Sequence, residues 1–472
     1  MKRLKKIGKV PVKKSSEIAF SRIGVGFEKL DRALFDPEKA YDLVAGLGVK
    51  YARIQSGWMR TETKKGVYDF AWIDSIVENL LSQGIEPWIN LCYGNPLYTE
   101  LAGQFFGGVG CPPTEKEALD AWLSYVQALV RHMKGKVEKF EIWNEPDCLY
   151  SWKTPGKVEG SKGTPDPREY GEFALATAKA IRQANQNAYI MGFALGHAYE
   201  SGFLNEAMKT GLGDCIDAVS YHIYSTMTEA RMNVHENMRA IARAYNPRLE
   251  MVQGESGTQS EFSHAGALKF MNWDRTKQAK HLLRLMVIDL ATDCRLVSYF
   301  SALDMVEALH GFANDKKSHM DYGYFGVISA EFDENGIASG EYGKKPSYFA
   351  LQTLSSLFAG NCRPITVPCT FKSEECKYTN SPDYRGADVL YHAFCTDDGK
   401  TLFTYWRNTE LLTTAYDGTA SIELLCNSKP ELIDLMDGSV YEIPDEMITE
   451  ENGATRLWHL PLRDYPLAIR YR

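Results

Sequence analysis

Strand-like and helix-like patterns alternate along the chain from about residue 20 to residue 300. The strand-like runs are short and apolar, and they cover Ser21–Phe27, Val49–Gln55, Ile85–Cys92, Val137–Trp143, Tyr189–Ala194, Ile216–Tyr224, Glu250–Gln253 and Arg295–Phe300. Between them, apolar residues recur at helical spacing in Pro37–Gly46, Phe70–Ser82, Thr114–Met133, Pro167–Ala184, Gly202–Thr210, Val234–Ala244 and Thr276–Thr292. Alternation of this kind is typical of βα units around a parallel sheet. Eight such units predict an α/β fold, the (β/α)8 TIM barrel.

A doubly wound open sheet is the main alternative for the same alternation. That fold usually carries a glycine-rich phosphate loop directly after its first strand. Here the segment Gly24-Val25-Gly26-Phe27 lacks the third glycine and opens no clear helix. The barrel is therefore the favoured architecture.

A different pattern begins after about residue 355. Short strand-like runs separated by turns cover Val389–Thr396, Thr401–Trp406, Ala420–Leu425, Glu431–Leu435, Ala454–Leu460 and the final segment 460–472. These runs predict an all-β domain, a sandwich. Because 472 residues exceed the usual size of one domain, we predict two. They are a barrel over 16–355 and a β-sandwich accessory domain over 356–472, to which residues 1–15 would add a strand.

Composition and charge exclude several classes of partner. The net charge is −8, with no long basic block beyond the first residues, which argues against nucleic acid. The basic start, MKRLKKIGKVPVKKSSEIAF, lacks the apolar segment of a signal peptide, and no run of 18 apolar residues indicates a membrane span. We therefore expect a cytoplasmic protein with neither nucleic-acid nor membrane partners, and we leave open whether it forms a homo-oligomer. The ten cysteines form no CxxC pair, which favours reduced thiols over a zinc cluster.

Two glutamates follow predicted strands. The fourth strand-like run leads into Asn144-Glu145-Pro146, and a proline interrupts a sheet ladder. The seventh run leads into Gly254-Glu255-Ser256-Gly257. Taken singly, each segment is more often a turn or a loop. In a TIM barrel, however, catalytic groups lie at the carboxyl ends of strands. Strands four and seven lie nearly opposite one another, so we expect Glu145 and Glu255 to face each other across the mouth.

A facing pair of carboxylates is what glycosidic bond cleavage requires. One carboxyl, in its protonated form, donates to the leaving oxygen, and the other acts as a nucleophile or as a base for water. A separation of roughly 5–5.5 Å gives retention of configuration, and roughly 6.5–9.5 Å gives inversion. The sequence thus predicts that Glu145 and Glu255 are catalytic.

These segments resemble clan A of the glycoside hydrolases, and most closely family 39, which includes β-xylosidases. The resemblance rests on Trp143-Asn144-Glu145-Pro146, Gly254-Glu255-Ser256-Gly257, the His-x-Tyr pattern in Ser220–Tyr224, Arg53 on the second strand, Asp321–Val327 and Lys345–Ala350. It implies a (β/α)8 barrel followed by a small β-sandwich, with an acid/base glutamate on strand four and a nucleophile glutamate on strand seven. Two features differ from the clan. Phe300 stands where many members carry tryptophan, and Glu255–Trp273 is a long loop that we do not match to family 39.

The resemblance implies different roles for the two glutamates. Glu145 would be the general acid and then the base, which needs a pKa raised by burial or by the nearby charge of Glu255. Glu255 would be the ionised nucleophile, and Arg53 and Tyr224 would keep it ionised. The chemistry requires no metal and no organic cofactor.

Substrate-binding roles follow from the same resemblance. Asn144 would donate to the sugar 2-hydroxyl, and His222 would bind a hydroxyl or orient a carboxylate. The aromatic residues expected on or near strand ends, as stacking candidates, are Trp58, Tyr93, Trp273 and Phe300.

The resulting functional hypothesis is a retaining β-glycosidase. Its substrate partner would be a β-linked oligosaccharide or glycoside, with xyloside, galactoside and glucoside as the candidate sugars. An endo-β-glucanase of the same clan is the nearest enzymatic alternative. A non-catalytic carbohydrate-binding barrel is the alternative from another class, and the presence of both glutamates argues against it.

Overall fold

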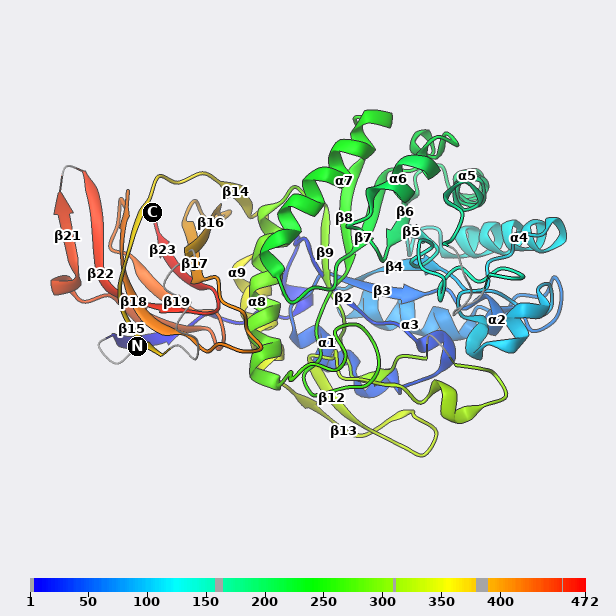
Figure 1. Ribbon diagram of the computed structural model, residues 1–472, viewed down its shortest axis with the longest axis horizontal. Helices are drawn as coiled ribbons and strands as arrows, with labels where there is room; N and C mark the ends of the chain where they lie inside the picture. Colours follow the sequence, from blue (N-terminus) through cyan, green and yellow to red (C-terminus); the bar gives the residue numbers. More distant parts are fainter. Residues whose placement is uncertain (1–3, 158–163, 309–310, 379–388, 452) are drawn as a thin grey trace.

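The computed structural model describes residues 4–157, 164–308, 311–378, 389–451 and 453–472. Its larger part is a closed barrel of eight parallel strands arranged in chain order (Figure 1), which confirms the predicted fold. The barrel strands are β2 (Ile23–Gly26), β3 (Tyr51–Gln55), β4 (Glu86–Leu91), β5 (Lys139–Ile142), β6 (Tyr189–Leu195), β7 (Ala218–His222), β8 (Glu250–Glu255) and β9 (Leu296–Tyr299). The barrel closes where β2 pairs with β9, with Val25 opposite Tyr299.

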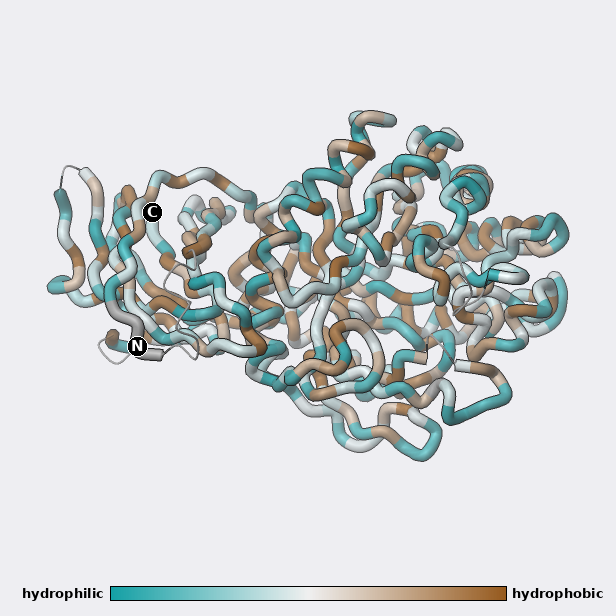
Figure 2. Tube along the Cα trace, viewed as in Figure 1, coloured by the Kyte–Doolittle hydropathy of each residue, from teal (hydrophilic) through white to brown (hydrophobic). Residues whose placement is uncertain are grey.

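Helices connect the strands and surround the barrel (Figure 1). Those that correspond to the predicted helical runs are α1 (Tyr41–Gly46), α3 (Ala71–Ser82), α4 (Lys116–Met133), α5 (Pro167–Ala184), α6 (Ser201–Met208), α7 (Arg231–Tyr245) and α8 (Arg275–Ala291). A short helix, α2 (Trp58–Thr61), lies in the loop after β3. Hydrophobic and hydrophilic residues alternate along these helices (Figure 2), as expected of helices that bury one face against a sheet.

The inside of the barrel changes from apolar to polar along the strands. A buried apolar cluster forms its floor and consists of Tyr51, Trp88, Met191, Ala218, Val252 and Leu296. Residues two positions apart on a strand share a face. One such step toward the carboxyl ends leads from Tyr51 to Arg53 and from Ala218 to Ser220, and both polar residues are fully buried. The alternation of the strands thus places a polar layer directly above the apolar floor.

The second part of the chain is antiparallel and all-β, as predicted. One sheet has the strand order β1-β20-β19-β23-β17-β16-β14, and the other has the order β15-β18-β22-β21. The strands are β1 (Lys5–Lys9), β14 (Arg363–Ile365), β15 (Thr370–Tyr378), β16 (Val389–Cys395), β17 (Thr401–Arg407), β18 (Asp417–Leu424), β19 (Glu431–Asp434), β20 (Ser439–Glu442), β21 (Ile448–Glu451), β22 (Ala454–Arg463) and β23 (Leu467–Tyr471). Apolar side chains of both sheets, among them Phe403, Ile422, Leu460 and Ile469, share one buried cluster, so the sheets form a sandwich.

Two short antiparallel pairs and one helix lie between the barrel strands and the sandwich in sequence. They are β10 (Met305–Val306) with β11 (Tyr322–Gly323), β12 (Ile328–Phe332) with β13 (Ala338–Lys344), and α9 (Pro346–Leu357). The division predicted at residue 355 falls inside α9, which packs against α8, so the division into domains stays a prediction. At the other end of the chain, β1 pairs with β20, with Lys5 opposite Glu442.

Each helix in the described ranges is too short or too polar to cross a lipid bilayer.

Helix α8 is covered on both sides, because it lies between the barrel and the sandwich (Figure 1). Its Arg284 is fully buried and donates to the carbonyl oxygens of Thr409 and Arg407 at 2.7 and 2.9 Å. The same guanidinium lies 3.6 Å from the carboxylate of Glu229. Arg284 therefore ties the loop after β17 to the barrel.

We predict that Arg284→Leu lowers the free energy of unfolding by about 3–5 kcal/mol, because two carbonyl groups lose their donor and the largely buried Glu229 carboxylate loses its neighbouring cation. The midpoint of urea denaturation measures the effect. Arg295→Leu is the matched control, since the Arg295 side chain is half-exposed and lies 4.0 Å from Glu250. The control should change stability by less than about 1 kcal/mol. Equal effects of the two substitutions would contradict the role given to Arg284.

Candidate active site

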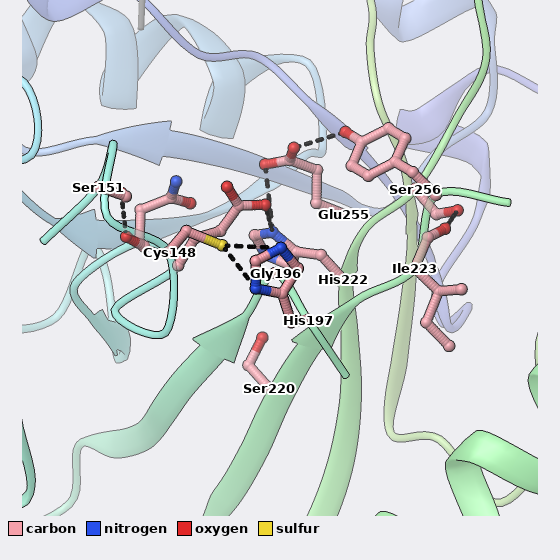
Figure 3. Close-up of polar contacts among 12 residues, drawn as sticks. Cys148, Ser151, Gly196, His197, Ser220, His222, Ile223, Glu255 and Ser256 are labelled. Atoms are coloured by element: carbon pink, nitrogen blue, oxygen red, sulfur yellow. Dashed lines mark hydrogen bonds and ion pairs between the residues drawn. The ribbon is translucent and has the colours of Figure 1, made fainter. Parts of the chain in front are cut away.

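Glu145 and Glu255 face each other at the mouth of the barrel. Glu145 follows β5 and Glu255 ends β8, and both side chains are largely buried. One carboxylate oxygen of each glutamate and a ring nitrogen of His222 all lie within 4.8 Å of one another. Figure 3 shows Glu255 and His222 side by side at the ends of the barrel strands. The structure therefore brings the two predicted glutamates together.

The local backbone turns both side chains toward this point. Trp143 and Glu145 have φ angles of 65° and 48°, in the left-handed region that non-glycine residues rarely adopt. In β8, Gly254 and Glu255 together oppose the single residue His222. An irregularity of this kind changes the direction in which the side chain at that point of the strand projects, here that of Glu255. A Cβ at Gly254 would lie 2.6 Å from the Ser220 hydroxyl oxygen, so the close packing requires a glycine there.

Arg53 lies at the centre of the site and is fully buried. Its Nε donates to Glu141 at 2.6 Å, and its Nη1 donates to Glu28 at 2.8 Å and to Glu255 at 3.0 Å. Its Nη2 donates to the side-chain oxygen of Asn144 at 2.9 Å. Burial alone would lower the pKa of Arg53, but the three carboxylates outweigh it and raise the pKa. Arg53 is thus a buried cation that binds four residues, which lie on or just after the three strands β2, β5 and β8.

Separate donors serve the two facing glutamates. His222 Nδ1 lies 2.9 Å from Glu145 Oε1, and the Tyr150 hydroxyl donates to Glu145 Oε2 at 2.6 Å. The Tyr224 hydroxyl donates to Glu255 Oε1. The same His222 nitrogen lies 3.8 Å from Glu255. His222 therefore stands between the two carboxylates, closer to Glu145.

These contacts shift the two pKa values in opposite directions. Burial raises the pKa of Glu145, but the hydrogen bonds from His222 and Tyr150 outweigh burial and hold the pKa below its ordinary value. Burial, together with the charges of Glu28 and Glu145, raises the pKa of Glu255 to about 7, although His222 and Arg53 act against it. The expectation of a raised pKa for Glu145 is therefore wrong, because the hydrogen bond and charge of His222, with the hydrogen bond of Tyr150, outweigh burial. The raised pKa belongs to Glu255.

The four aromatic stacking candidates have different surroundings. Phe300 lies next to the site, with its ring edge-on to Tyr224 at 6.4 Å. Tyr93 packs edge-on against Trp143 at 5.7 Å. Trp58 is fully buried and donates from its indole nitrogen to Glu62 at 2.6 Å.

Trp273 lies among residues of its own loop and of α8. Its indole nitrogen donates to the Leu268 carbonyl, and its ring packs edge-on against His281 at 5.5 Å. These contacts hold the loop against α8, and they do not include the facing glutamates.

Sequence reasoning missed three members of the site, namely Glu28, Glu141 and Tyr150. Glu28 follows β2 by two residues, so it is also an acid near a strand end and the same criterion would have found it. Glu141 lies inside β5 and is fully buried, and its signal is an acidic residue in the middle of a strand of apolar neighbours. Tyr150 reaches Glu145 through a turn, which leaves no comparable pattern in the sequence.

Among the described residues, two groups bring three metal-binding side chains together. One is Glu145, His222 and Glu255, and the other is Asp147, Cys148 and His197. In the second group, Asp147 accepts backbone hydrogen bonds from Gly196 and His197 at 2.9 and 2.7 Å. Figure 3 shows the Cys148 sulfur directed at the His197 ring. Side chains of both groups therefore already form hydrogen bonds with other groups of the same chain.

The fold resembles solved structures of glycoside hydrolases. One is a family 39 glycoside hydrolase from the gut symbiont Bacteroides cellulosilyticus WH2, with a TM-score of 0.63 and 18% identity, covering 98% of this chain and 83% of that chain. Another is a monomeric β-xylosidase from Caulobacter crescentus CB15, with a TM-score of 0.61 and 18% identity, covering 99% and 97%. At this identity, the likeness shows the fold alone.

Comparison of sequences identifies the family. A β-xylosidase of Caldicellulosiruptor saccharolyticus is 24% identical over 339 residues, which are 66% of this chain and 62% of that protein. A β-xylosidase of Geobacillus stearothermophilus is 25% identical over 175 residues, which are 34% of this chain and 32% of that protein. The matches thus span less than two thirds of the length of these relatives. The family model for glycosyl hydrolases of family 39 matches residues 36–355, which include the barrel strands β3 to β9 and both facing glutamates. The chain therefore belongs to family 39 of the glycosyl hydrolases.

Proposed function

We propose that this glycoside hydrolase is a retaining β-glycosidase that acts by double displacement, with Glu145 as acid/base and Glu255 as nucleophile. The observation that carries the proposal is the approach of the two carboxylates, an oxygen of each lying within 4.8 Å of the other. Retaining enzymes keep their carboxyl groups roughly 5–5.5 Å apart, whereas inverting enzymes need roughly 6.5–9.5 Å to admit a water. The short separation supports direct attack by a carboxylate.

In the first step, a Glu255 oxygen attacks the anomeric carbon and forms a glycosyl ester. The bond from that carbon to the leaving oxygen breaks, and the leaving oxygen takes the proton of Glu145. In the second step, a water attacks the anomeric carbon and gives a proton to Glu145. The ester bond then breaks, and Glu255 regains its negative charge.

The surrounding residues have complementary roles in this scheme. Arg53 and Tyr224 bind different oxygens of Glu255, which fixes the orientation of the attacking carboxylate. The side-chain oxygen of Asn144 accepts a hydrogen bond from Arg53, which leaves the amide nitrogen to donate to the sugar 2-hydroxyl. Asn144 and Arg53 therefore position substrate and nucleophile together.

The two glutamates share one proton near neutral pH. The pKa of Glu145 is lowered and that of Glu255 is raised to about 7, so the pair keeps a proton up to about pH 7. The pKa values of such a pair belong to the pair rather than to one residue. The reactive form has the proton on Glu145, and His222, which lies within 3.8 Å of both carboxylates, offers a route between them.

The substrate that we propose is a β-xyloside. Both relatives described above carry the name β-xylosidase, and this supports xylose as the sugar whose glycosidic bond is cleaved. Galactoside and glucoside remain the alternatives, and endo-β-glucanase activity is the alternative mode of action.

Glu145→Gln and Glu255→Gln should each lower kcat/KM on aryl β-glycosides. With a poor leaving group, we expect a loss of at least ~10²–10⁴-fold for Glu145→Gln, the usual contribution of acid–base catalysis. With an activated leaving group, such as dinitrophenol, Glu145→Gln should recover much of its first-step rate, but Glu255→Gln should not. Unchanged hydrolysis in either variant would refute the assignment and favour a barrel that only binds carbohydrate.

The pH dependence should report the shared proton. Above about pH 7 the pair loses its last proton and no acid remains, so kcat/KM should fall by about tenfold per pH unit. The profile is measured with an aryl glycoside of poor leaving group on the wild type. In Glu145→Gln, with an activated substrate, the fall should disappear, since ionised Glu255 alone is then required. A fall that persists in this variant would assign the pKa to another group.

A substrate panel with product NMR tests sugar and stereochemistry together. Among aryl β-xyloside, β-galactoside, β-glucoside and arabinoside, we expect the highest kcat/KM on the xyloside. The first-formed free sugar should be the β-anomer, because two inversions restore the configuration. A first-formed α-anomer would overturn the nucleophile role of Glu255, and a preference for another sugar would replace only the substrate assignment.

A further inference from the structure

Three side chains of metal-binding type lie together on the two loops that follow β5 and β6. Asp147 and Cys148 belong to the loop after β5, and His197 lies two residues after the end of β6. One ligand atom of each side chain lies within 4.8 Å of the other two. The group thus combines a carboxylate oxygen, a sulfur and an imidazole nitrogen, and these are the three kinds of atom that bind zinc in proteins.

The distances around the sulfur fit a tetrahedral metal ion. Cys148 Sγ lies 3.6 and 3.8 Å from the two ring nitrogens of His197 and 3.8 Å from Asp147 Oδ1 (Figure 3). Zinc binds sulfur at about 2.3 Å and nitrogen or oxygen at about 2.0–2.2 Å, so tetrahedral angles separate its ligand atoms by roughly 3.6 Å. Because the His197 side chain is exposed, its ring can rotate and bring either nitrogen to the ion. The three side chains can therefore bind one ion without a change of the backbone.

The backbone already holds the carboxylate and the sulfur in place. Asp147 accepts hydrogen bonds from the backbone N–H groups of Gly196 and His197 at 2.9 and 2.7 Å. Each carboxylate oxygen has two lone pairs, so both oxygens can still bind an ion, and hydrogen bonds of this kind orient the carboxylates of known metal sites. A Cβ at position 196 would lie 2.7 Å from the Cys148 sulfur, so the glycine permits the close approach of the two loops.

A pocket of 570 Å³ adjoins this group. Asp147 and His197 both line it. Zinc that is bound by three protein side chains commonly takes a water as its fourth ligand, and the pocket has room for that water. The pocket is also lined by Tyr150, whose hydroxyl donates to Glu145. An ion at this position would therefore lie beside the segment that carries the proposed acid.

The kinds of ligand atom select the class of ion. Ca²⁺ and Mg²⁺ take oxygen ligands, whereas thiolate and imidazole favour zinc and related transition metals. Another Cys–His–Asp set among the described residues has a different arrangement. There, Cys294 lies 3.5 Å from Nδ1 of His235, and Asp293 lies 2.7 Å from Nε2 of the same ring. The sulfur and the carboxylate contact different nitrogens of that ring, so the three side chains do not surround one point.

We propose that Asp147, Cys148 and His197 form a binding site for Zn²⁺ or a related transition-metal ion, with water as the fourth ligand. Cys148 binds as the thiolate, so its proton passes to the solvent when the ion binds. The ion joins the loop after β5 to the loop after β6. The site is separate from the facing glutamates, and it does not depend on the reaction proposed for them.

Co²⁺ is the probe for this site, because tetrahedral cobalt bound to a thiolate has a charge-transfer absorption band. Titration of the full chain, without a polyhistidine tag, should show this band, and Zn²⁺ should then abolish it by displacing the cobalt. Cys148→Ser should remove the band. His197→Gln should weaken Co²⁺ binding by at least about 10–100-fold, since removal of a mere hydrogen-bond partner of a ligand already has that effect. Saturating Zn²⁺ should raise the Tm of the wild type but not of these variants, because an ion that binds only the native state stabilises it.

Cys294→Ser is the matched control, since it removes the sulfur of the set that does not surround one point. This variant should keep the charge-transfer band and the affinity for Co²⁺. A wild type that binds no Co²⁺, or a band that persists in Cys148→Ser, would overturn the site. Displacement of Co²⁺ by an excess of Mg²⁺ or Ca²⁺ would overturn the class of ion. These measurements use no glycoside, so their failure and the failure of the proposed function are separate results.

Discussion

The buried guanidinium of Arg53 is the interaction on which the candidate site depends. It binds Glu28, Glu141, Glu255 and Asn144, so one side chain joins groups from three strands of the barrel, β2, β5 and β8. A buried charge is costly unless it is paired and fully hydrogen-bonded. Here the three carboxylates offset the cost of burying the guanidinium. The guanidinium in turn offsets the cost of burying these carboxylates, one of which is the proposed nucleophile. The polar layer is stable because its members are paired with one another.

The partition of charge between Glu145 and Glu255 follows from which donors reach each of them. Glu145 accepts hydrogen bonds from His222 and Tyr150. Glu255 accepts from Arg53 and Tyr224, but Arg53 divides its charge among three carboxylates, and the charges of Glu28 and Glu145 raise the pKa of Glu255. The pair therefore holds one proton to about pH 7. Two carboxylates with the same covalent chemistry acquire different proton affinities from their neighbours alone.

The sequence predicted the barrel well, because its strands are buried on both faces and read as compact apolar runs between amphipathic helices. It also predicted that Glu145 and Glu255 meet, since the order of strands in a barrel fixes which ends are opposite. It did not predict Glu141, because only the closed barrel reveals that this position points inward. Nor did it predict the direction of the pKa shift at Glu145. That direction depends in part on the Tyr150 hydroxyl, which a turn of the chain brings to Glu145. The strands β14, β15, β20 and β21 were missed because their short or polar segments lack alternation.

The apolar floor of the barrel has a kinetic consequence. The ring of side chains that includes Tyr51, Trp88 and Leu296 fills the interior beneath Arg53, so the barrel is a packed core and offers no passage toward its other end. In the proposed reaction, the released sugar would leave through the same opening by which the next substrate arrives. Product and substrate would then compete for one site, so free sugar would slow turnover.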